Sequence, residues 1–190
     1  MKQMIQDDLL GRHLFGRLSK FLAGPIWQYG HYSNSRRDRY CFWNARFAGG
    51  DGRSRESCDS ELSSNPQNKV ICEVWDVLKE SILVGHEPLR VYANAHTFGV
   101  EGYVHQDSSD LTNYFTTIIF SHPVWHENWG GELLIFNQER TLIEEAIQAQ
   151  PGRSVHFLGG RPHTARAVSR DCPNLRVSLV VKSQIVRANA

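Results

Sequence analysis

The sequence lacks a long hydrophobic run and an excess of charge of either sign. Its strongly apolar stretches are only several residues long, and charged side chains are spread through the first 24 residues, which predicts neither a transmembrane helix nor a signal peptide. The 21 Lys and Arg against 20 Asp and Glu give a net charge of +1, too little to create a broad field for duplex nucleic acid or an anionic membrane. We therefore expect a cytoplasmic protein with neither of these partners.

Closely spaced cysteines are also missing. The wide separation of the four cysteines excludes a CxxC metal site and the disulfide framework of a small secreted domain. We therefore expect four reduced thiols, at Cys41, Cys58, Cys72 and Cys172. Hydrophobic residues make up 41% and charged residues 22% of the chain, which is typical of a folded globular protein and excludes a disordered one. The length of 190 residues favours one domain, residues 1–190.

The first part of the chain shows two helical patterns separated by a polar stretch. Apolar residues at three and four residue spacings predict helices over 5–23 and 69–84, the first ended by Gly24-Pro25 and the second capped by Gly85. Residues 49–68 have almost no apolar content and are expected to form a surface loop or a mobile lid. We divide the domain into an N-terminal helical and loop region, 1–68, and a core, 69–190.

After Pro88 the pattern changes to short segments rich in β-branched and aromatic residues. They are LRVYANA, YFTTIIF, GELLIF, SVHFL, TARAV and LRVSLVVK, and ERTLIEEAIQ at 139–148 is predicted to form a helix between two of them. Helices followed by a run of strands indicate an α+β fold in which the strands close as a sandwich or barrel braced by helices. The mouth of such a barrel is a common place for a metal or small ligand.

Candidate metal ligands stand in EGYVHQDS, where His105 and Asp107 are two residues apart and would share one face of a strand. A further histidine, His163, follows in GGRPH on a later predicted strand. Two His and one Asp form the facial triad of non-haem Fe(II) oxygenases. In LRVSLVVK, Arg176 and Ser178 also share a face, and an inward Arg needs an anion such as a carboxylate.

The order H-x-D, NWGGELLIF, GGRPH and R-x-S resembles the Fe(II)/2-oxoglutarate-dependent dioxygenases, particularly their prolyl-hydroxylase-like branch. The resemblance covers roughly residues 88–182. It implies a double-stranded β-helix (a jelly-roll or cupin-like barrel), and Fe(II) on His105, Asp107 and His163. It also implies a 2-oxoglutarate C5 carboxylate on Arg176 and Ser178, with Tyr92 at the position of an aromatic hydroxyl that often completes this site.

The same resemblance implies a hydroxylase that consumes dioxygen and 2-oxoglutarate and releases succinate and CO2. Related halogenases have a small residue in place of the carboxylate ligand, so Asp107 predicts hydroxylation of an unactivated C-H bond. We expect a small substrate, an amino acid or biosynthetic intermediate; a peptide or protein side chain is the alternative. Desaturation and ring closure stay open, as do a cupin-like metalloenzyme that does not use 2-oxoglutarate and a binding module without catalysis.

For other residues the sequence gives weaker evidence of a part in substrate binding or catalysis. Trp129 and Arg166 are candidates for substrate contacts, while Gly130 and Gly131 indicate a tight entry to a strand. The segment SNSRRDR at 33–39 has no interleaved aromatic residues and is interpreted as a solvated loop. The rival histidines are not followed by R-x-S at strand spacing: His122, His126 and His156.

Overall fold

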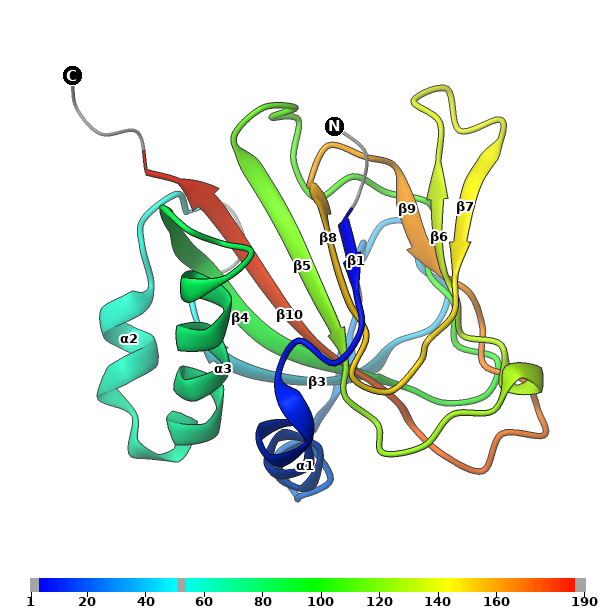
Figure 1. The fold of residues 1–190 in the computed structure, drawn as a ribbon. Coiled ribbons are helices and arrows are strands. Elements are labelled where there is room, and N and C mark those ends of the chain that lie inside the picture. The colour runs from blue at the N-terminus through cyan, green and yellow to red at the C-terminus, as the bar shows by residue number, and fades with distance from the viewer. Residues whose placement is uncertain (1–3, 51–53, 187–190) are drawn as a thin grey trace.

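Two antiparallel β-sheets form the framework of the described part of the chain, residues 4–50 and 54–186 of a computed structural model (Figure 1). The seven-stranded sheet has the order β1-β8-β5-β10-β4-β3-β2 and the three-stranded sheet the order β7-β6-β9. The strands of the large sheet are β1 (Met4–Gln6), β2 (Gln28–His31), β3 (Phe42–Ala48), β4 (His86–His96), β5 (Tyr114–Phe120), β8 (Ser154–Leu158) and β10 (Arg176–Ile185). The small sheet contains β6 (Leu133–Phe136), β7 (Ile143–Ile147) and β9 (His163–Ala165).

The central strand β10 separates the two sides of the molecule. It lies between β4 and β5, and its residues from Arg176 to Ser183 are all buried. Because successive side chains of a strand point to opposite faces, Val177, Leu179 and Val181 join the core beneath the helices. The alternate residues, from Arg176 to Lys182, line a cavity on the other face.

Helices cover the first of these faces. The amphipathic helices α1 (Gly11–Leu22) and α3 (Lys69–Glu80) pack on one side of the large sheet, with Leu18 and Leu78 completely buried (Figure 1). Full burial of such a side chain stabilises the fold by roughly 1.5–3 kcal/mol. The expected bracing of the strands by N-terminal helices is confirmed.

The small sheet packs against the opposite face. Leu133 and Ile135 of β6 and Ile147 of β7 form one core with residues of the large sheet such as Phe120 and Phe157. The molecule is therefore layered as helices, large sheet and small sheet, and a cavity lies between the sheets. The predicted mixture of helices with a later run of strands is confirmed.

The helix predicted at 139–148 is wrong. Residues 143–147 form β7, which pairs with β6 in a hairpin, and of these five residues only Ile147 is fully buried. Asn137 folds the connection by accepting hydrogen bonds from the backbone N-H groups of Thr141 and Leu142 at 2.9 and 3.1 Å. A run as short as LIEEAI fits the periodicity of a helix and that of a strand equally well, and pairing with β6 stabilises the strand.

The predicted loop at 49–68 is wrong for its second half. Asp59–Ser64 form helix α2 and Pro66–Asn68 a 3-10 turn, while residues 51–53 lie outside the described part. Leu62 is buried in the core under the helices, and the Trp75 indole donates a hydrogen bond of 2.8 Å to Asp59. These contacts make the segment part of the helical layer, so it is not a mobile lid.

The other N-terminal predictions need smaller corrections. Residues 4–6 pair with β8, so α1 begins at Gly11 and not at residue 5. Helix α3 ends at Glu80 with Ser81 as its C-cap, and Gly85 instead takes a positive φ of 76° just before β4. Strands β2 and β3 were not predicted. All four cysteines are free, and no helix in the described part of the chain is long and apolar enough to span a membrane.

Shortening Leu78 tests the helical layer. We expect Leu78→Ala to lower the free energy of unfolding by about 2–5 kcal/mol, because it leaves a cavity in a fully buried position. The control Val84→Ala, at a side chain that is 69% exposed, should change it by less than about 0.5 kcal/mol. Urea denaturation measures both, and equal effects would contradict the described packing.

Candidate metal and anion site

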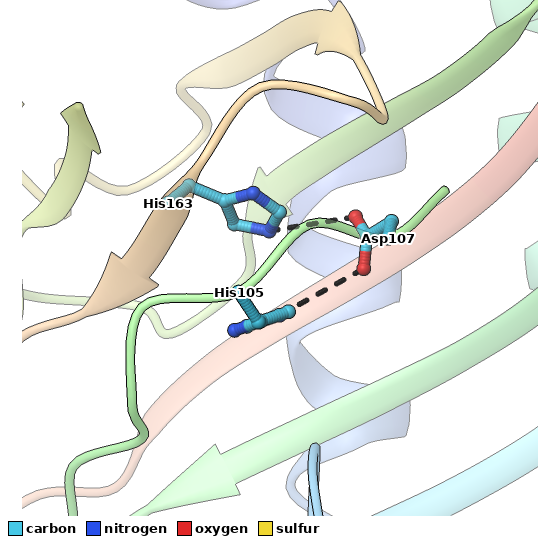
Figure 2. A group of neighbouring side chains, drawn as sticks. All are labelled: His105, Asp107 and His163. Carbon is cyan, nitrogen blue, oxygen red and sulfur yellow. Dashed lines mark ion pairs between the residues drawn. The ribbon is translucent and has the colours of Figure 1, made fainter. Parts of the chain in front are cut away.

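Three metal-ligand side chains meet in the cavity between the sheets. His105 Nε2 lies 3.8 Å from Asp107 Oδ1, and His163 Nε2 lies 3.4 Å from Asp107 Oδ2 (Figure 2). The ligand atoms of all three residues lie within 4.8 Å of one another. The structure thus brings together the two histidines and the carboxylate that the sequence singled out.

Backbone pairing holds the two histidines side by side. The His105 N-H donates to the His163 carbonyl at 3.0 Å, and the His163 N-H donates back to the His105 carbonyl at 2.9 Å. His163 begins β9 as expected, but His105 is not at the end of a strand, because this isolated bridge is the only β pairing that the segment makes within the described residues. The backbone of Asp107 is tied separately, by a 2.8 Å bond from its N-H to the Gly159 carbonyl.

Hydrogen bonds to backbone carbonyls fix which nitrogen of each imidazole is free. His105 Nδ1 lies 3.0 Å from the Tyr103 carbonyl, and His163 Nδ1 lies 2.8 Å from the Arg161 carbonyl. A carbonyl only accepts, so each Nδ1 carries a proton, and in the neutral form of each ring the lone pair is on Nε2, the nitrogen that faces Asp107. Two such lone pairs beside a carboxylate fit a metal cation, and metal-bound histidines are commonly oriented in this way.

A buried lysine also approaches the carboxylate. Lys182 of β10 donates to Asp107 Oδ2, and the same oxygen accepts from the Thr116 hydroxyl at 2.6 Å. Burial alone would raise the pKa of Asp107, but Lys182 and the two imidazoles outweigh it and hold this pKa well below its usual range. Asp107 is therefore ionised, as a metal ligand must be.

The protonation states of the neighbours are also set by their surroundings. Burial lowers the pKa of His163 to about 4, so its imidazole is neutral and free to bind a cation. For Lys182 burial lowers the pKa, but the Asp107 carboxylate outweighs burial and the net pKa is raised. Lys182 was not predicted from the sequence, although it lies at alternate spacing from Arg176 and Ser178 and follows the apolar residues Leu179, Val180 and Val181.

Arg176 lies at the other end of the same face of β10. Its residue is 2% exposed, its Nε donates to the Gly131 carbonyl at 2.5 Å, and its guanidinium carbon lies 5.0 Å from the centre of the Phe120 ring. Burial lowers its pKa to about 10, which leaves it positively charged at neutral pH. Gly131 makes room for it, because a Cβ there would come within 2.9 Å of Arg176 Cδ.

Ser178 and Tyr92 line the same cavity as Arg176 and the three metal-ligand residues. His96 lines it as well and was not predicted: it pairs with Arg176 across the sheet, is 6% exposed, and neither ring nitrogen has a hydrogen-bond partner. Burial, helped by Arg176, lowers the pKa of His96 to about 3, so the ring is neutral. A neutral donor and acceptor therefore stand beside the cationic end of the cavity.

Trp129 and Arg166 do not line this cavity. The Arg166 side chain is 63% exposed and lies 3.9 Å from Glu132, while Trp129 packs edge-on against Trp125. The rival histidines are also elsewhere: His122 is held by the Ala149 carbonyl, His156 is 2.9 Å from the Thr117 hydroxyl, and His126 is exposed. None of these three belongs to the cluster around Asp107.

Removing a ligand should weaken metal binding. We expect His105→Ala and Asp107→Ala to reduce the affinity for Mn(II) by more than about 100-fold, since even outer contacts of a metal site are worth about 10–100-fold. The control His126→Ala changes an exposed histidine outside the cluster and should leave the affinity unchanged. Equilibrium dialysis with Mn(II) distinguishes these outcomes, and equal affinities in all variants would contradict the site.

Removing the lysine should destabilise the metal-free protein. We expect Lys182→Met to lower the free energy of unfolding by about 3–5 kcal/mol, because it leaves a buried carboxylate without its cation. The double variant Asp107→Asn/Lys182→Met should recover part of this loss, and the exposed control Lys79→Met should cost less than about 1 kcal/mol. Urea denaturation with a chelator present makes the comparison; equal costs for both lysines would argue against the pair.

No protein-family model and no curated protein matches the sequence. Solved structures do match. An oxidoreductase of the 2OG-Fe(II) oxygenase family from Burkholderia pseudomallei has a TM-score of 0.74 at 15% identity, over 98% of this chain and 86% of that chain. A prolyl hydroxylase from Trichoplax adhaerens, solved with a peptide of the hypoxia inducible factor oxygen degradation domain, has a TM-score of 0.67 at 13% identity, over 96% and 83%.

A viral collagen prolyl hydroxylase from Paramecium bursaria Chlorella virus 1, solved as a 2OG complex, gives a TM-score of 0.65 at 13% identity. That alignment covers 98% of this chain and 97% of the viral one. Such low identity over nearly the whole chain establishes shared architecture. The chain therefore has the fold of the 2OG-Fe(II) oxygenases and prolyl hydroxylases.

Proposed function

We propose that the protein is an Fe(II)- and 2-oxoglutarate-dependent dioxygenase that hydroxylates an unactivated C-H bond of a small substrate. The observation that carries this proposal is that His105, Asp107 and His163 meet in one cavity with a buried Arg176. The fold supports it, and we infer that the two facing sheets are the double-stranded β-helix of this enzyme class. An arrangement of unrelated surface residues would not bring four such groups into one cavity.

Fe(II) would be held by His105 Nε2, His163 Nε2 and a carboxylate oxygen of Asp107. A site with two His and one carboxylate leaves coordination positions open. Fe(II) held there would activate dioxygen, and 2-oxoglutarate would donate two of the electrons that reduce it. The protein fixes both imidazoles through the Tyr103 and Arg161 carbonyls, so that their free nitrogens face the metal. Asp107 fills the carboxylate position, which favours hydroxylation over halogenation.

The co-substrate would be bound along β10 and β4. We assign its C5 carboxylate to Arg176 and Ser178, with Tyr92 on the neighbouring strand completing the site. A buried guanidinium pairs with a carboxylate more strongly than an exposed one, because little water competes. Arg176 is already held by Gly131 and Phe120, so little side-chain freedom is lost on binding.

A small substrate is favoured by the size of the cavity beside the metal ligands. This cavity, lined by His105, Asp107 and Tyr114 among others, has a volume of about 280 Å³, which matches a small metabolite. A peptide or protein side chain is the second candidate, and it is favoured by the Trichoplax hydroxylase, which was solved with a peptide. A screen of amino acids, small acids and proline-containing peptides for succinate release separates the two.

Arg176 provides the sharpest test of the co-substrate. Wild-type protein should release succinate only with both Fe(II) and 2-oxoglutarate, and Arg176→Gln should raise the dissociation constant for 2-oxoglutarate by about 30-fold or more, the loss expected when one partner of a buried charge pair is removed. The control Arg12→Gln removes an exposed arginine on α1 and should bind 2-oxoglutarate normally. Binding is followed by calorimetry on the Mn(II)-loaded protein.

Two results would contradict the proposal. If metal-loaded wild type does not bind 2-oxoglutarate, the protein is not a dioxygenase of this kind. If it is catalytically active but insensitive to Arg176→Gln and to omission of 2-oxoglutarate, it is a cupin-like metalloenzyme instead. Stoichiometric ligand binding that persists with a chelator would indicate a binding module without catalysis.

A further inference from the structure

Two cavities meet beside His105. The first, of about 280 Å³, contains Asp107 and Lys182 in its lining, and the second, of about 350 Å³, is lined by arginines. They share the lining residues Asn34, His105 and Gln106, so they lie side by side. We call these two adjoining cavities the basic groove; its second cavity is lined by Asn34, Arg36, Arg37, Val104, His105, Gln106 and Arg140.

The turn at 33–38 presents two arginines to the basic groove. Its single carboxylate, Asp38, is buried and accepts hydrogen bonds from the backbone N-H groups of Asn34 at 2.7 Å and Tyr103 at 3.1 Å. These bonds tie the turn to the segment that leads into His105. Arg36 and Arg37 are exposed, as expected for a solvated loop, and both line the basic groove.

A third arginine comes from the hairpin between β6 and β7. Arg140 has a positive φ of 61° and its Nη2 donates to Gln106 Oε1 at 3.0 Å. Gln106 is itself held by a 2.6 Å bond from its Nε2 to the Gly160 carbonyl. Arg140 is therefore held by Gln106, the residue between His105 and Asp107 in the sequence.

A fourth arginine lies deeper in the basic groove. Arg90 packs its guanidinium 4.3 Å from the centre of the Tyr92 ring, and its Nε is buried without a hydrogen-bond partner. A buried N-H without an acceptor costs about 1–3 kcal/mol, so a bound acceptor there would be favourable.

Negative charge is scarce in the basic groove. Among the described residues that line it, Asp107 is the single carboxylate, and Lys182 already pairs with it. Within residues 4–50 and 54–186 no ion pair is formed by Arg36, Arg37, Arg90 or Arg140. This excess of positive charge is confined to the groove, since the whole chain has a net charge of only +1.

We propose that the basic groove binds an oxyanion, a carboxylate or phosphate, carried by the small-molecule substrate. This inference rests on the proposed hydroxylase function and names the chemical class of its substrate. Guanidinium groups match both oxyanions through paired hydrogen bonds, and the arginines lie beside the metal ligand His105. The cavity volumes suit a small molecule, and the near-zero net charge gives no long field for a polyanion.

Calorimetry tests the groove without turnover. Propionate and methyl phosphate, which bind Mn(II) only weakly, are titrated into Mn(II)-loaded protein saturated with 2-oxoglutarate, and we expect binding that weakens at least about 10-fold in Arg36→Gln/Arg37→Gln. The matched control Arg12→Gln/Lys20→Gln removes the same charge from α1, on the helical side of the large sheet, and should change the affinity less than about twofold. Equal weakening in both variants, or no binding to wild type at about 10 mM, would overturn the proposal.

A substrate screen completes the test. Compounds that stimulate succinate release should be acids or phosphates whose amides or esters are inactive, and Arg36→Gln/Arg37→Gln should raise KM about 10-fold or more with kcat changed much less. Stimulation by neutral or cationic compounds, or by single-stranded oligonucleotides, would overturn the inference while leaving the hydroxylase function intact. Failure of wild type to bind 2-oxoglutarate would instead remove the proposed function, and the anion titration is still interpretable with Mn(II) alone.

Discussion

The carboxylate of Asp107, whose side chain is only 12% exposed, is the constraint on which the site depends. An ionised group in a protein interior is tolerated only when cations and donors surround it, and here these come from its own segment and from three strands. Thr116 and Lys182 approach from neighbouring strands, and His105 and His163 from the facing side. The same carboxylate therefore ties the loop after Tyr103 to both sheets, and the groups that balance it are those that can bind a metal.

Strand β10 connects the site to the core of the molecule. One face supplies apolar side chains to the helical layer, while the other carries Arg176, Ser178 and Lys182 into the cavity. A cationic group stands at each end of that row, one beside the metal-ligand residues and one beside Gly131. The small sheet packs against this second face, so the polar row is buried although it is not part of the apolar core. The position of both charges is set by the alternation of a single strand.

Much of this could be predicted from the sequence, and the rest depends on contacts between distant residues. The spacing of two residues predicted that His105 lies beside Asp107 and that Arg176 lies beside Ser178, and the structure brings all four into one cavity with His163. By contrast, β7 and α2 were missed because short segments take their conformation from partners, β6 in one case and the helical core in the other. Lys182 had a signal in its alternation, but pairing with Asp107 joins residues 75 positions apart.

Gly131 connects a turn at the surface of the small sheet to the anion end of the cavity. Its φ of 74° disfavours any other residue, and an added Cβ would meet both Arg176 and Trp125, at 2.9 and 3.1 Å. The residue has no functional group, yet a methyl group at this position would displace the guanidinium it adjoins. In a mutational survey, substitutions of this glycine would therefore reduce activity as substitutions of binding-site residues do. Sensitivity to substitution at a position does not show that the side chain at that position contacts a ligand.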